Sequence, residues 1–290
     1  MLTVGVIEVN ENILKDVYQK RNEWSHKGDY GRLLVIGGSK YYTGAPFLVA
    51  MAAMRAGVDI VTIAAPQKVA SIIASFSPNI IVRGFGDSTF SIKNVNSIAK
   101  LSRQFDAIVI GNGIGMGSET KGFVKEFLKI NKRPCVIDGD ALKFLDIEEI
   151  RLNAKYMLMP HANEFYELCK EKVKNNVSDR IGKVKKIAKI INAIIVLKGH
   201  VDVISDGKRV AINKTGNAFM TKAGTGDVLA GIAGSMLARG IDTFNAACAS
   251  CHLCGKAGDK AAKKLKDSLL ATDVIDNIPS VLSETMNPRY

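Results

Sequence analysis

The sequence predicts an α/β fold in which helices cover both faces of a mostly parallel sheet. Between residues 32 and 197, short apolar runs that end at glycine or a polar residue alternate with stretches of helical periodicity. Strands that are apolar throughout are typical of parallel sheets buried on both faces. The alternation contains no linker, low-complexity tract or repeat. We therefore expect one domain over residues 1–290, with residues 1–25 as an N-terminal arm or short helix.

The apolar runs place strands at 32–37, 58–64, 79–82, 107–110, 134–137, 156–159 and 193–197. Segments with helical spacing lie between most of them, at 45–56, 67–75, 91–103, 118–130, 162–170 and 179–191. After residue 197 the pattern changes, because the runs 201–205 and 209–212 flank Asp206-Gly207, which is a hairpin signal. Helices are then expected at 227–239, 243–264 and 271–285.

The charge balance favours small anionic substrates. The 290 residues carry 40 Lys and Arg against 28 Asp and Glu, a formal net charge of +12. The basic residues are spread along the chain, and no aromatic residues interleave with them to stack on bases, so we expect no nucleic-acid partner. The densest run, Lys183 to Lys189, fits the solvated face of a helix with Val184, Ile187, Ala188 and Ile191 on its inner face.

Targeting signals are not evident in the sequence. The N-terminus has no apolar signal segment, and no window of about 18 apolar residues occurs. We therefore expect a cytoplasmic protein without a membrane partner.

The five cysteines are an odd count, which argues against a complete disulfide framework. Cys248, Cys251 and Cys254 are spaced by three, as in an iron–sulfur run, but such a run needs a fourth cysteine followed by proline, and residues 255–264 contain neither. Residues three apart on a helix form a stripe, so we expect these cysteines to pack there and to hold no metal.

The strongest chemical signal is Ala223-Gly224-Thr225-Gly226-Asp227, which directly precedes an amphipathic helix. The free N–H groups and positive dipole of a helix N-terminus favour an anion, and glycines let a phosphate approach the backbone. Asp227 has two interpretations at this point. It either caps the helix, or it is a general base beside a phosphate that deprotonates a substrate hydroxyl.

Other polar groups follow the ends of predicted strands. They are Gly37-Gly38-Ser39, the glycines 111, 113, 115 and 117, Asp138-Gly139-Asp140, Pro160-His161 and Lys198-Gly199-His200. Parallel strands bring their carboxyl ends to one edge of the sheet, where open α/β sheets bind ligands. The chain lacks both the Gly-x-x-x-x-Gly-Lys-Ser/Thr loop and the Gly-x-Gly-x-x-Gly fingerprint. These signals together favour an enzyme that binds a nucleotide and transfers or activates its phosphate.

The combination of motifs resembles the ADP/ATP-dependent NAD(P)H-hydrate dehydratases, carbohydrate-kinase-like enzymes of the ribokinase-like superfamily. The resemblance covers about residues 22–285. The matching stretches are 26–31, 35–39, 42–46, 136–142, 159–161, 196–199, 215–217, 224–231, 257–259 and 271–275. The Gly-Thr-Gly-Asp piece is shared with many small-molecule kinases, whereas Lys-Gly-Asp-x-Gly, Thr-Gly-Ala-Pro and Pro-His together are more specific.

The resemblance implies a hydro-lyase that dehydrates hydrated NADH or NADPH with ADP or ATP as co-substrate and Mg²⁺ as cofactor. Asp227 would be the catalytic base. Contacts to the hydrated dinucleotide would come from Ala45, Gly113, Gly115, His161 and Asp227. Contacts to the nucleotide would come from Lys198, Gly199, His200, Val201, Asp202, Gly224, Thr225 and Gly226. The family also suggests a homo-oligomer, and with about 25 residues before the match we expect no N-terminal epimerase domain.

Several positions depart from the family pattern. Asn163 stands where the family usually has glycine, Asn112 where it has proline, and Ala223 precedes the Gly-Thr-Gly-Asp piece; Cys254-Gly255 replaces a frequent His-Gly. None of these departures involves Asp227. Two other functions stay open. One is a kinase for a small alcohol such as a hydroxymethylpyrimidine, a hydroxyethylthiazole or a sugar, and the other is a non-catalytic nucleotide-binding regulator.

Overall fold

The computed structural model describes residues 5–147 and 152–286. They form a ten-stranded sheet in the order β1-β10-β9-β8-β7-β6-β5-β2-β3-β4. The strands are β1 (Val6–Glu8), β2 (Arg32–Ile36), β3 (Ile60–Pro66), β4 (Ile81–Phe85), β5 (Ala107–Ile110), β6 (Cys135–Ile137), β7 (Tyr156–Leu158), β8 (Ile194–Leu197), β9 (Asp202–Ser205) and β10 (Val210–Asn213). β9 runs antiparallel to β8 and β10, and the other described pairs are parallel. The α/β class and the mostly parallel sheet are thus confirmed.

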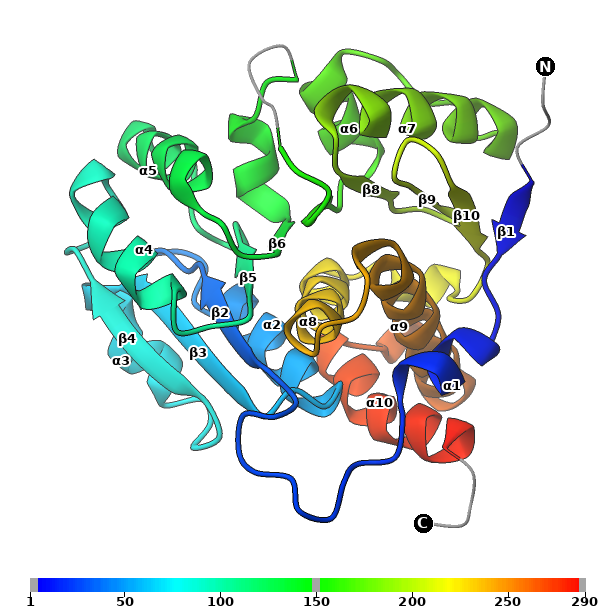
Figure 1. Cartoon of the computed structure of the whole chain (residues 1–290), viewed down its shortest axis with the longest axis horizontal. Coiled ribbons are helices and arrows are strands. Elements are labelled where there is room, and N and C mark those ends of the chain that lie inside the picture. The colour runs from blue at the N-terminus through cyan, green and yellow to red at the C-terminus, as the bar shows by residue number, and fades with distance from the viewer. Residues whose placement is uncertain (1–4, 148–151, 287–290) are drawn as a thin grey trace.

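Helices cover both faces of this sheet (Figure 1). They are α1 (Asn12–Val17), α2 (Gly44–Arg55), α3 (Gln67–Ala74), α4 (Val95–Ser102), α5 (Ser118–Ile130), α6 (Ala162–Cys169), α7 (Val177–Ile191), α8 (Thr225–Ala238), α9 (Thr243–Leu265) and α10 (Ala271–Thr285). Helices α2, α3, α8, α9 and α10 pack into one apolar core, and α4, α5, α6 and α7 into a second core on the opposite face. No helix within the described residues is both long enough and apolar enough to cross a membrane.

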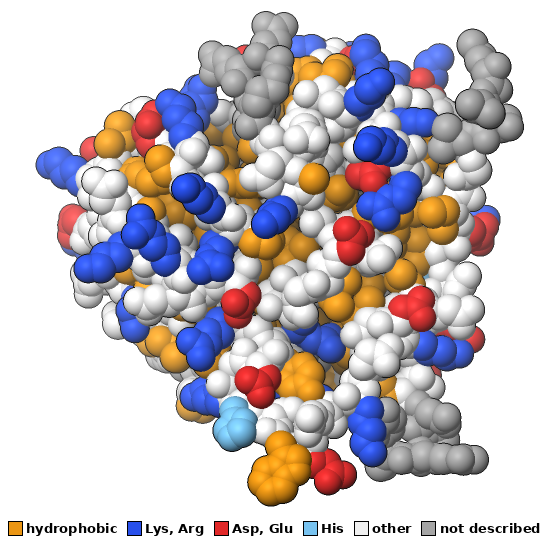
Figure 2. All heavy atoms as spheres, viewed as in Figure 1, with side chains coloured by type: hydrophobic (Ala, Val, Ile, Leu, Met, Phe, Trp, Pro, Cys, Tyr) orange, Lys and Arg blue, Asp and Glu red, His pale blue; other side chains and the backbone are white. Residues whose placement is uncertain are grey.

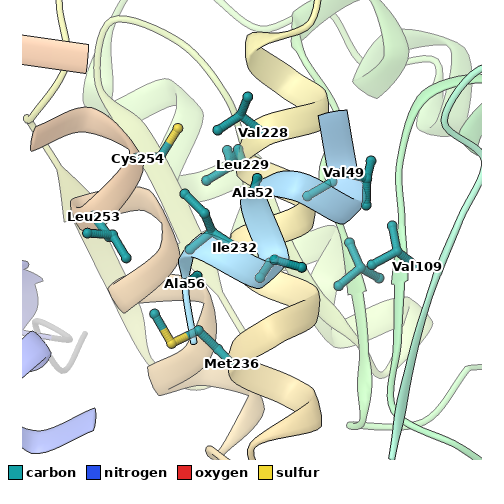
Figure 3. Packing of buried hydrophobic residues seen from close by; sticks show 14 of the residues in the cluster. Val49, Ala52, Ala56, Val109, Val228, Leu229, Ile232, Met236, Leu253 and Cys254 are labelled. Atoms are coloured by element: carbon teal, nitrogen blue, oxygen red, sulfur yellow. The ribbon is translucent and has the colours of Figure 1, made fainter. Parts of the chain in front are cut away.

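The helix-rich core is centred on α8, whose residues 228–238 are all buried. Figure 3 shows α8 between α2, α9 and the strand β5; its labelled side chains are Val49, Ala52, Ala56, Val109, Val228, Leu229, Ile232, Met236, Leu253 and Cys254. Cys248, Cys251 and Cys254 are free thiols buried on α9 in this core. The prediction that they form a packing stripe on a helix is confirmed.

Two expectations about element positions need correction. The strand expected at 79–82 is β4, Ile81–Phe85, which pairs with β3 from Thr62 onward. The N-terminal arm contains not only the helix α1 but also the strand β1, which pairs in parallel with β10. All three β1 residues are exposed. Backbone hydrogen bonds at a sheet edge hold this strand, and an apolar pattern cannot reveal such a strand.

Glycine is required where α8 crosses α2. A Cβ on Gly231 would lie 2.2 Å from the carbonyl oxygen of Val49 and 2.9 Å from the Cβ of Ala52. We expect Gly231→Ala to lower the free energy of unfolding by about 2 kcal/mol, because well-packed cores do not tolerate added volume. The matched control is Gly182→Ala on the exposed face of α7, where nothing lies within 4 Å.

Gly182→Ala should raise the free energy of unfolding by about 0.5–1 kcal/mol, since alanine is the better helix former. Urea denaturation of the two variants and the parent measures both changes. Destabilisation of equal size in the two variants would contradict the packing argument at Gly231.

Candidate active site

The carboxyl ends of five adjacent strands, β8, β7, β6, β5 and β2, meet the N-terminus of α8. Their order in the sheet places Lys198 after β8, Asp138 after β6 and the glycine loop 111–117 after β5. Contacts join these strand ends directly. The Lys198 ammonium lies 2.7 Å from the Asp138 carboxylate, and the Gly38 N–H donates to the carbonyl of Asn112 at 3.2 Å. The expected gathering of polar residues at one sheet edge is confirmed.

Asp227 lies in the first turn of α8 but does not cap the helix. The N-cap is Gly224, in the left-handed region with φ 95°, and no side chain caps this end. The Oδ1 atom of Asp227 instead accepts a hydrogen bond of 2.7 Å from the Nδ2 group of Asn112, which belongs to the glycine loop. The capping interpretation is therefore wrong, and the carboxylate is directed toward the strand ends.

The environment of Asp227 holds its carboxylate near its titration point. Burial raises its pKa to about 7, and the neighbouring carboxylates of Asp138 and Asp140 act in the same direction. The hydrogen bond from Asn112 and the charge of Lys198 act in the opposite direction. A carboxylate with a pKa near the working pH is well suited to accept a proton from a substrate hydroxyl.

Lys198 is an ion-paired cation close to the start of α8. Its Nζ atom lies 2.7 Å from Asp138 Oδ1 and 3.8 Å from Glu164 Oε2. Burial acts to lower its pKa, but the charges of Asp138 and Glu164 raise the pKa above its ordinary value. A Cβ on Gly226 would lie 3.5 Å from this ammonium. A charged amine therefore lies beside the helix turn where a phosphate would bind.

The glycine loop packs on the segment that leads into α2. A Cβ on Gly113, which has φ 64°, would lie 3.1 Å from the Cβ of Ala45 and 2.6 Å from that of Tyr42. Gly115, with φ 88°, faces Ser39 in the same way. Only glycine combines this conformation with such close approach. The structure thus brings together Ala45 and the two loop glycines that the resemblance selected.

His161 is the N-cap of α6. Its Nδ1 atom accepts hydrogen bonds from the N–H groups of Asn163 at 3.2 Å and Glu164 at 3.3 Å, and the Glu164 side chain bonds back to the His161 N–H. This capping box fixes the ring with Nδ1 unprotonated. Asn163, where the family pattern has glycine, is accommodated in the first turn of the helix. The other ring nitrogen, Nε2, lies 3.5 Å from Glu164 Oε1.

A cavity of about 640 Å³ opens beside the N-terminus of α8. Six of the residues expected to bind the nucleotide line this cavity: Lys198, Gly199, His200, Asp202, Thr225 and Gly226. Val201 and Gly224 are not part of its lining, and neither are Ala45, Gly113 and Gly115. His161 lines the cavity although the resemblance gave it to the other substrate. The glycine-loop residues and the cavity are therefore separate places, with Asp227 next to both.

Sequence reasoning assigned no role to the far wall of this cavity. Its lining includes residues 215–218, Met220, Cys251, Cys254 and Gly255. Asp259 on α9 fixes this wall, because it accepts hydrogen bonds from the Gly216 N–H at 3.1 Å and the Asn217 amide at 2.8 Å. The stretches 215–217 and 257–259 were part of the motif resemblance, so the signal was present without an assigned function.

The loop after β8 is fixed by a partly buried carboxylate. Asp202 accepts hydrogen bonds from the Gly199 N–H and from the Asn213 amide, both at 3.0 Å. Burial raises the pKa of Asp202 despite these bonds. Asp202 thereby holds the loop 198–202 against β10 and shapes the cavity rim. On the face of the molecule shown in Figure 2, Lys and Arg side chains are scattered among acidic and neutral ones.

The order of the strands, together with the polar residues at their carboxyl ends beside α8, defines a ribokinase-like fold. A solved ribokinase-like superfamily protein from Enterococcus faecalis has a TM-score of 0.85 and 25% sequence identity, covering 99% of each chain. A model of the NAD(P)H-hydrate dehydratase family matches residues 33–280. The chain therefore belongs to the NAD(P)H-hydrate dehydratase family.

Individual relatives agree with this assignment. The bifunctional NAD(P)H-hydrate repair enzyme Nnr of Archaeoglobus fulgidus is 41% identical over 283 residues, 96% of this chain and 57% of the relative. The ADP-dependent (S)-NAD(P)H-hydrate dehydratase of Neisseria meningitidis serogroup B is 36% identical over 267 residues, 89% of this chain and 87% of the relative. The chain thus spans little more than half the length of the bifunctional relative.

A solved structure of the ADP/ATP-dependent NAD(P)H-hydrate dehydratase from Bacillus subtilis, co-crystallised with ATP and Mg²⁺, is also similar. Its TM-score is 0.83 at 26% identity, and the match covers 98% of this chain and all of the other.

Proposed function

We propose that this chain dehydrates hydrated NADH and NADPH at the expense of ADP or ATP, restoring the dinucleotide and releasing AMP or ADP with phosphate. The observation that carries the proposal is the position of Asp227. Its carboxylate has a pKa near 7 and lies in the first turn of α8, next to both the glycine loop and the cavity. A base between two binding places can activate a hydroxyl of one substrate toward the phosphate of the other.

The reaction would proceed by phosphoryl transfer, expulsion of phosphate and loss of a ring proton. Asp227 accepts the proton of the substrate hydroxyl as its oxygen attacks the terminal phosphorus of ADP or ATP, which releases AMP or ADP. The N–H groups at the start of α8 stabilise the charge that develops on the phosphoryl oxygens. The lone pair of the ring nitrogen then expels phosphate by C–O cleavage, which leaves a ring iminium. Loss of a proton from the neighbouring ring carbon to the released phosphate or to water restores the dihydronicotinamide ring.

The two substrates would occupy the two places described above. Ala45, Gly113 and Gly115 would contact the hydrated dinucleotide, and His161 would reach the same substrate from the lining of the cavity. The nucleotide would fill the cavity of about 640 Å³, a volume within the usual range for a small-molecule site. The loop 198–202 and the turn 224–226 would contact its phosphates and ribose.

Mg²⁺ would enter this site with the nucleotide. In the described part of the chain no three acidic, histidine or cysteine side chains converge to cage a metal. A carboxylate that is not the base is nevertheless present beside the α8 N-terminus, on Asp138. It fits Mg²⁺, which commonly binds substrate phosphates together with one or two carboxylates. When bound, Mg²⁺ would neutralise charge on the transferring phosphoryl group.

Lys222 is a further candidate phosphate contact. It lines the cavity, and its Nζ atom donates to the main-chain carbonyl of Asp267 at 2.7 Å. No described carboxylate pairs with it, in contrast to Lys198. We expect Lys222→Gln to weaken ADP binding about tenfold, since a charge-assisted contact of about 1.4 kcal/mol is lost. The affinity for adenosine should change little.

Isothermal titration with ADP and with adenosine measures the difference. Lys208→Gln, on the exposed β9–β10 turn, is the matched control and should bind both ligands as the parent does. An equal loss for the two ligands would show that Lys222 shapes the cavity and does not bind phosphate.

The proposed reaction is tested by mixing the purified protein with hydrated NADH, Mg²⁺ and either ADP or ATP. Near-ultraviolet absorbance of NADH should return only when a nucleotide is present, together with phosphate and AMP or ADP in equal amounts. A phosphorylated product that accumulates from a small alcohol, with no return of NADH, would instead identify a kinase. Binding without any turnover would identify a nucleotide-binding regulator.

The proposal includes a homo-oligomer, which the family resemblance implies, and a cytoplasmic location, which follows from the sequence expectation. Light scattering on the eluate of a size-exclusion column measures the number of copies.

A further inference from the structure

The side chain of Asn112 links two carboxylates of the site. Its Nδ2 group donates one hydrogen bond to Asp138 Oδ2 at 2.9 Å and a second to Asp227 Oδ1 at 2.7 Å. An amide nitrogen has two hydrogens, so both are used here. The reverse orientation would place the amide oxygen against two carboxylates. The two hydrogen bonds therefore fix which way the amide points.

The oxygen of the Asn112 amide receives no hydrogen bond from the described residues. Asn112 is 1% exposed, and its Oδ1 atom has no hydrogen-bond partner among the described residues. A buried acceptor without a donor carries a desolvation cost. The polar side chain is therefore poorly explained by stability alone, and residues of this kind are found where a site requires them.

The backbone around Asn112 is held rigidly by neighbouring strand ends. The Asn112 carbonyl accepts from the Gly38 N–H at 3.2 Å, and the Gly111 N–H donates to Ile36 at 3.1 Å. A Cβ on Gly111, which has φ 118°, would lie 2.0 Å from the carbonyl oxygen of Asp138. The side chain is thus presented to the two carboxylates from a loop with little freedom to move.

We propose that Asn112 is a positioning residue for Asp227, holding the carboxylate that accepts the substrate proton in place and separating its charge from that of Asp138. This inference rests on the proposed function, since it supplies the base of that reaction with its orientation. The charged groups that face Asp227 are Asp138 after β6, Asp140 in the turn 139–144 and Lys198 after β8. Asn112 is the neutral donor among them.

The electrostatic consequence has a definite sign. Donation to the carboxylate favours its ionised form, and Asn112 accordingly lowers the pKa of Asp227 against the effects of burial and Asp138. Removal of the donor leaves the two carboxylates opposed without a bridge. The pKa of Asp227 should then rise further above 7, and the acidic limb of the pH–rate profile should move with it.

The test compares the parent with Asn112→Leu, which has a similar shape without donors, and with the smaller Asn112→Ala. Carbon-13 NMR of labelled aspartate carboxyls follows the titration of Asp227, with its resonance assigned from Asp227→Asn. We expect the midpoint to rise by about one pH unit or more in both variants. Where the dehydratase assay is active, kcat/KM at pH 7 should fall about tenfold and partly recover at higher pH.

Asn131→Leu is the matched control. Asn131 is also a buried amide that donates twice, to Tyr156 Oη at 3.0 Å and to the carbonyl of Arg133 at 2.9 Å, but it lies at the end of α5 away from the site. The variant Asn131→Leu should leave the midpoint of the Asp227 titration unchanged. An unchanged midpoint in both Asn112 variants, or a loss of kcat/KM that is equal at every pH, would overturn the positioning role. Absence of parental activity would refute the proposed reaction, while the NMR titration would still decide the role of Asn112.

Discussion

Asp227→Asn is expected to lower kcat by a factor of about 10³ or more. Loss of a general base typically lowers the rate by about 10² to 10⁴. An asparagine amide cannot accept the proton of the attacking hydroxyl. Its oxygen can still accept the hydrogen bond from Asn112, so the geometry at the start of α8 should persist. ADP should therefore bind with nearly parental affinity. Single-turnover assays and calorimetry measure the two quantities separately.

The same variant should be more stable than the parent at pH 8. The folded pKa of Asp227 is about 7, above the ordinary value of 3.8. The folded state therefore holds this proton more tightly, and the associated stability is present below about pH 4 and lost as the pH rises through 7. Removing the ionised carboxylate should raise the free energy of unfolding at pH 8 by the order of 1 kcal/mol.

A matched control is Asp276→Asn, an exposed position on α10, which should change neither kcat nor stability measurably. The parent enzyme should lose activity about tenfold per unit as the pH falls below 7, because the protonated base is inactive. Substantial turnover in Asp227→Asn would remove Asp227 from the role of base.

Lys198→Met is expected to have the largest effect on stability, a loss of about 3 kcal/mol in the free energy of unfolding. Asp138 and Glu164 are 3% and 7% exposed, and Lys198 is the cation that pairs with both. Its removal leaves two buried carboxylates uncompensated. It also removes a charge that lowers the pKa of Asp227, so the acidic limb of the pH–rate profile should move upward.

Urea denaturation at pH 7 measures the change, with Lys186→Met as the control. The ion pair of Lys186 with Glu171 is solvent-accessible, with side-chain exposures of 61% and 29%. Such pairs contribute little, so the control should lose less than about 1 kcal/mol. Recovery of stability in Lys198→Arg would support the charge argument. A loss in Lys198→Met no greater than in the control would contradict it.

The sequence predicted the central sheet because its strands are buried on both faces. Residues 33–36 and 107–110 are apolar at every position, and such runs between helical segments leave few alternatives to a parallel sheet. The edges were less predictable. The strand β1 is exposed at each of its three residues and is held by backbone pairing to β10, which leaves no side-chain pattern to detect.

The sequence indicated the location of the candidate site because polar residues follow the ends of the predicted strands. Lys198 and His161 lie at one edge because they follow parallel strands, whose carboxyl ends come together. Asp227 lies beside them because α8 begins at this edge. The contact between Asn112 and Asp227 joins residues 115 positions apart. In the sequence Asn112 is visible only as a departure from a family pattern. Side-chain pairing of this kind depends on packing in three dimensions, which a single sequence does not display.

The most direct test of the account follows the oxygen of the substrate. Hydrated NADH labelled with oxygen-18 at its ring hydroxyl is incubated with the protein, Mg²⁺ and unlabelled ADP or ATP, and the released phosphate is analysed by mass spectrometry. Attack of the hydroxyl on phosphorus followed by C–O cleavage predicts one labelled oxygen in each phosphate formed. Label found in water, with unlabelled phosphate, would contradict phosphoryl transfer to the substrate and with it the role assigned to Asp227.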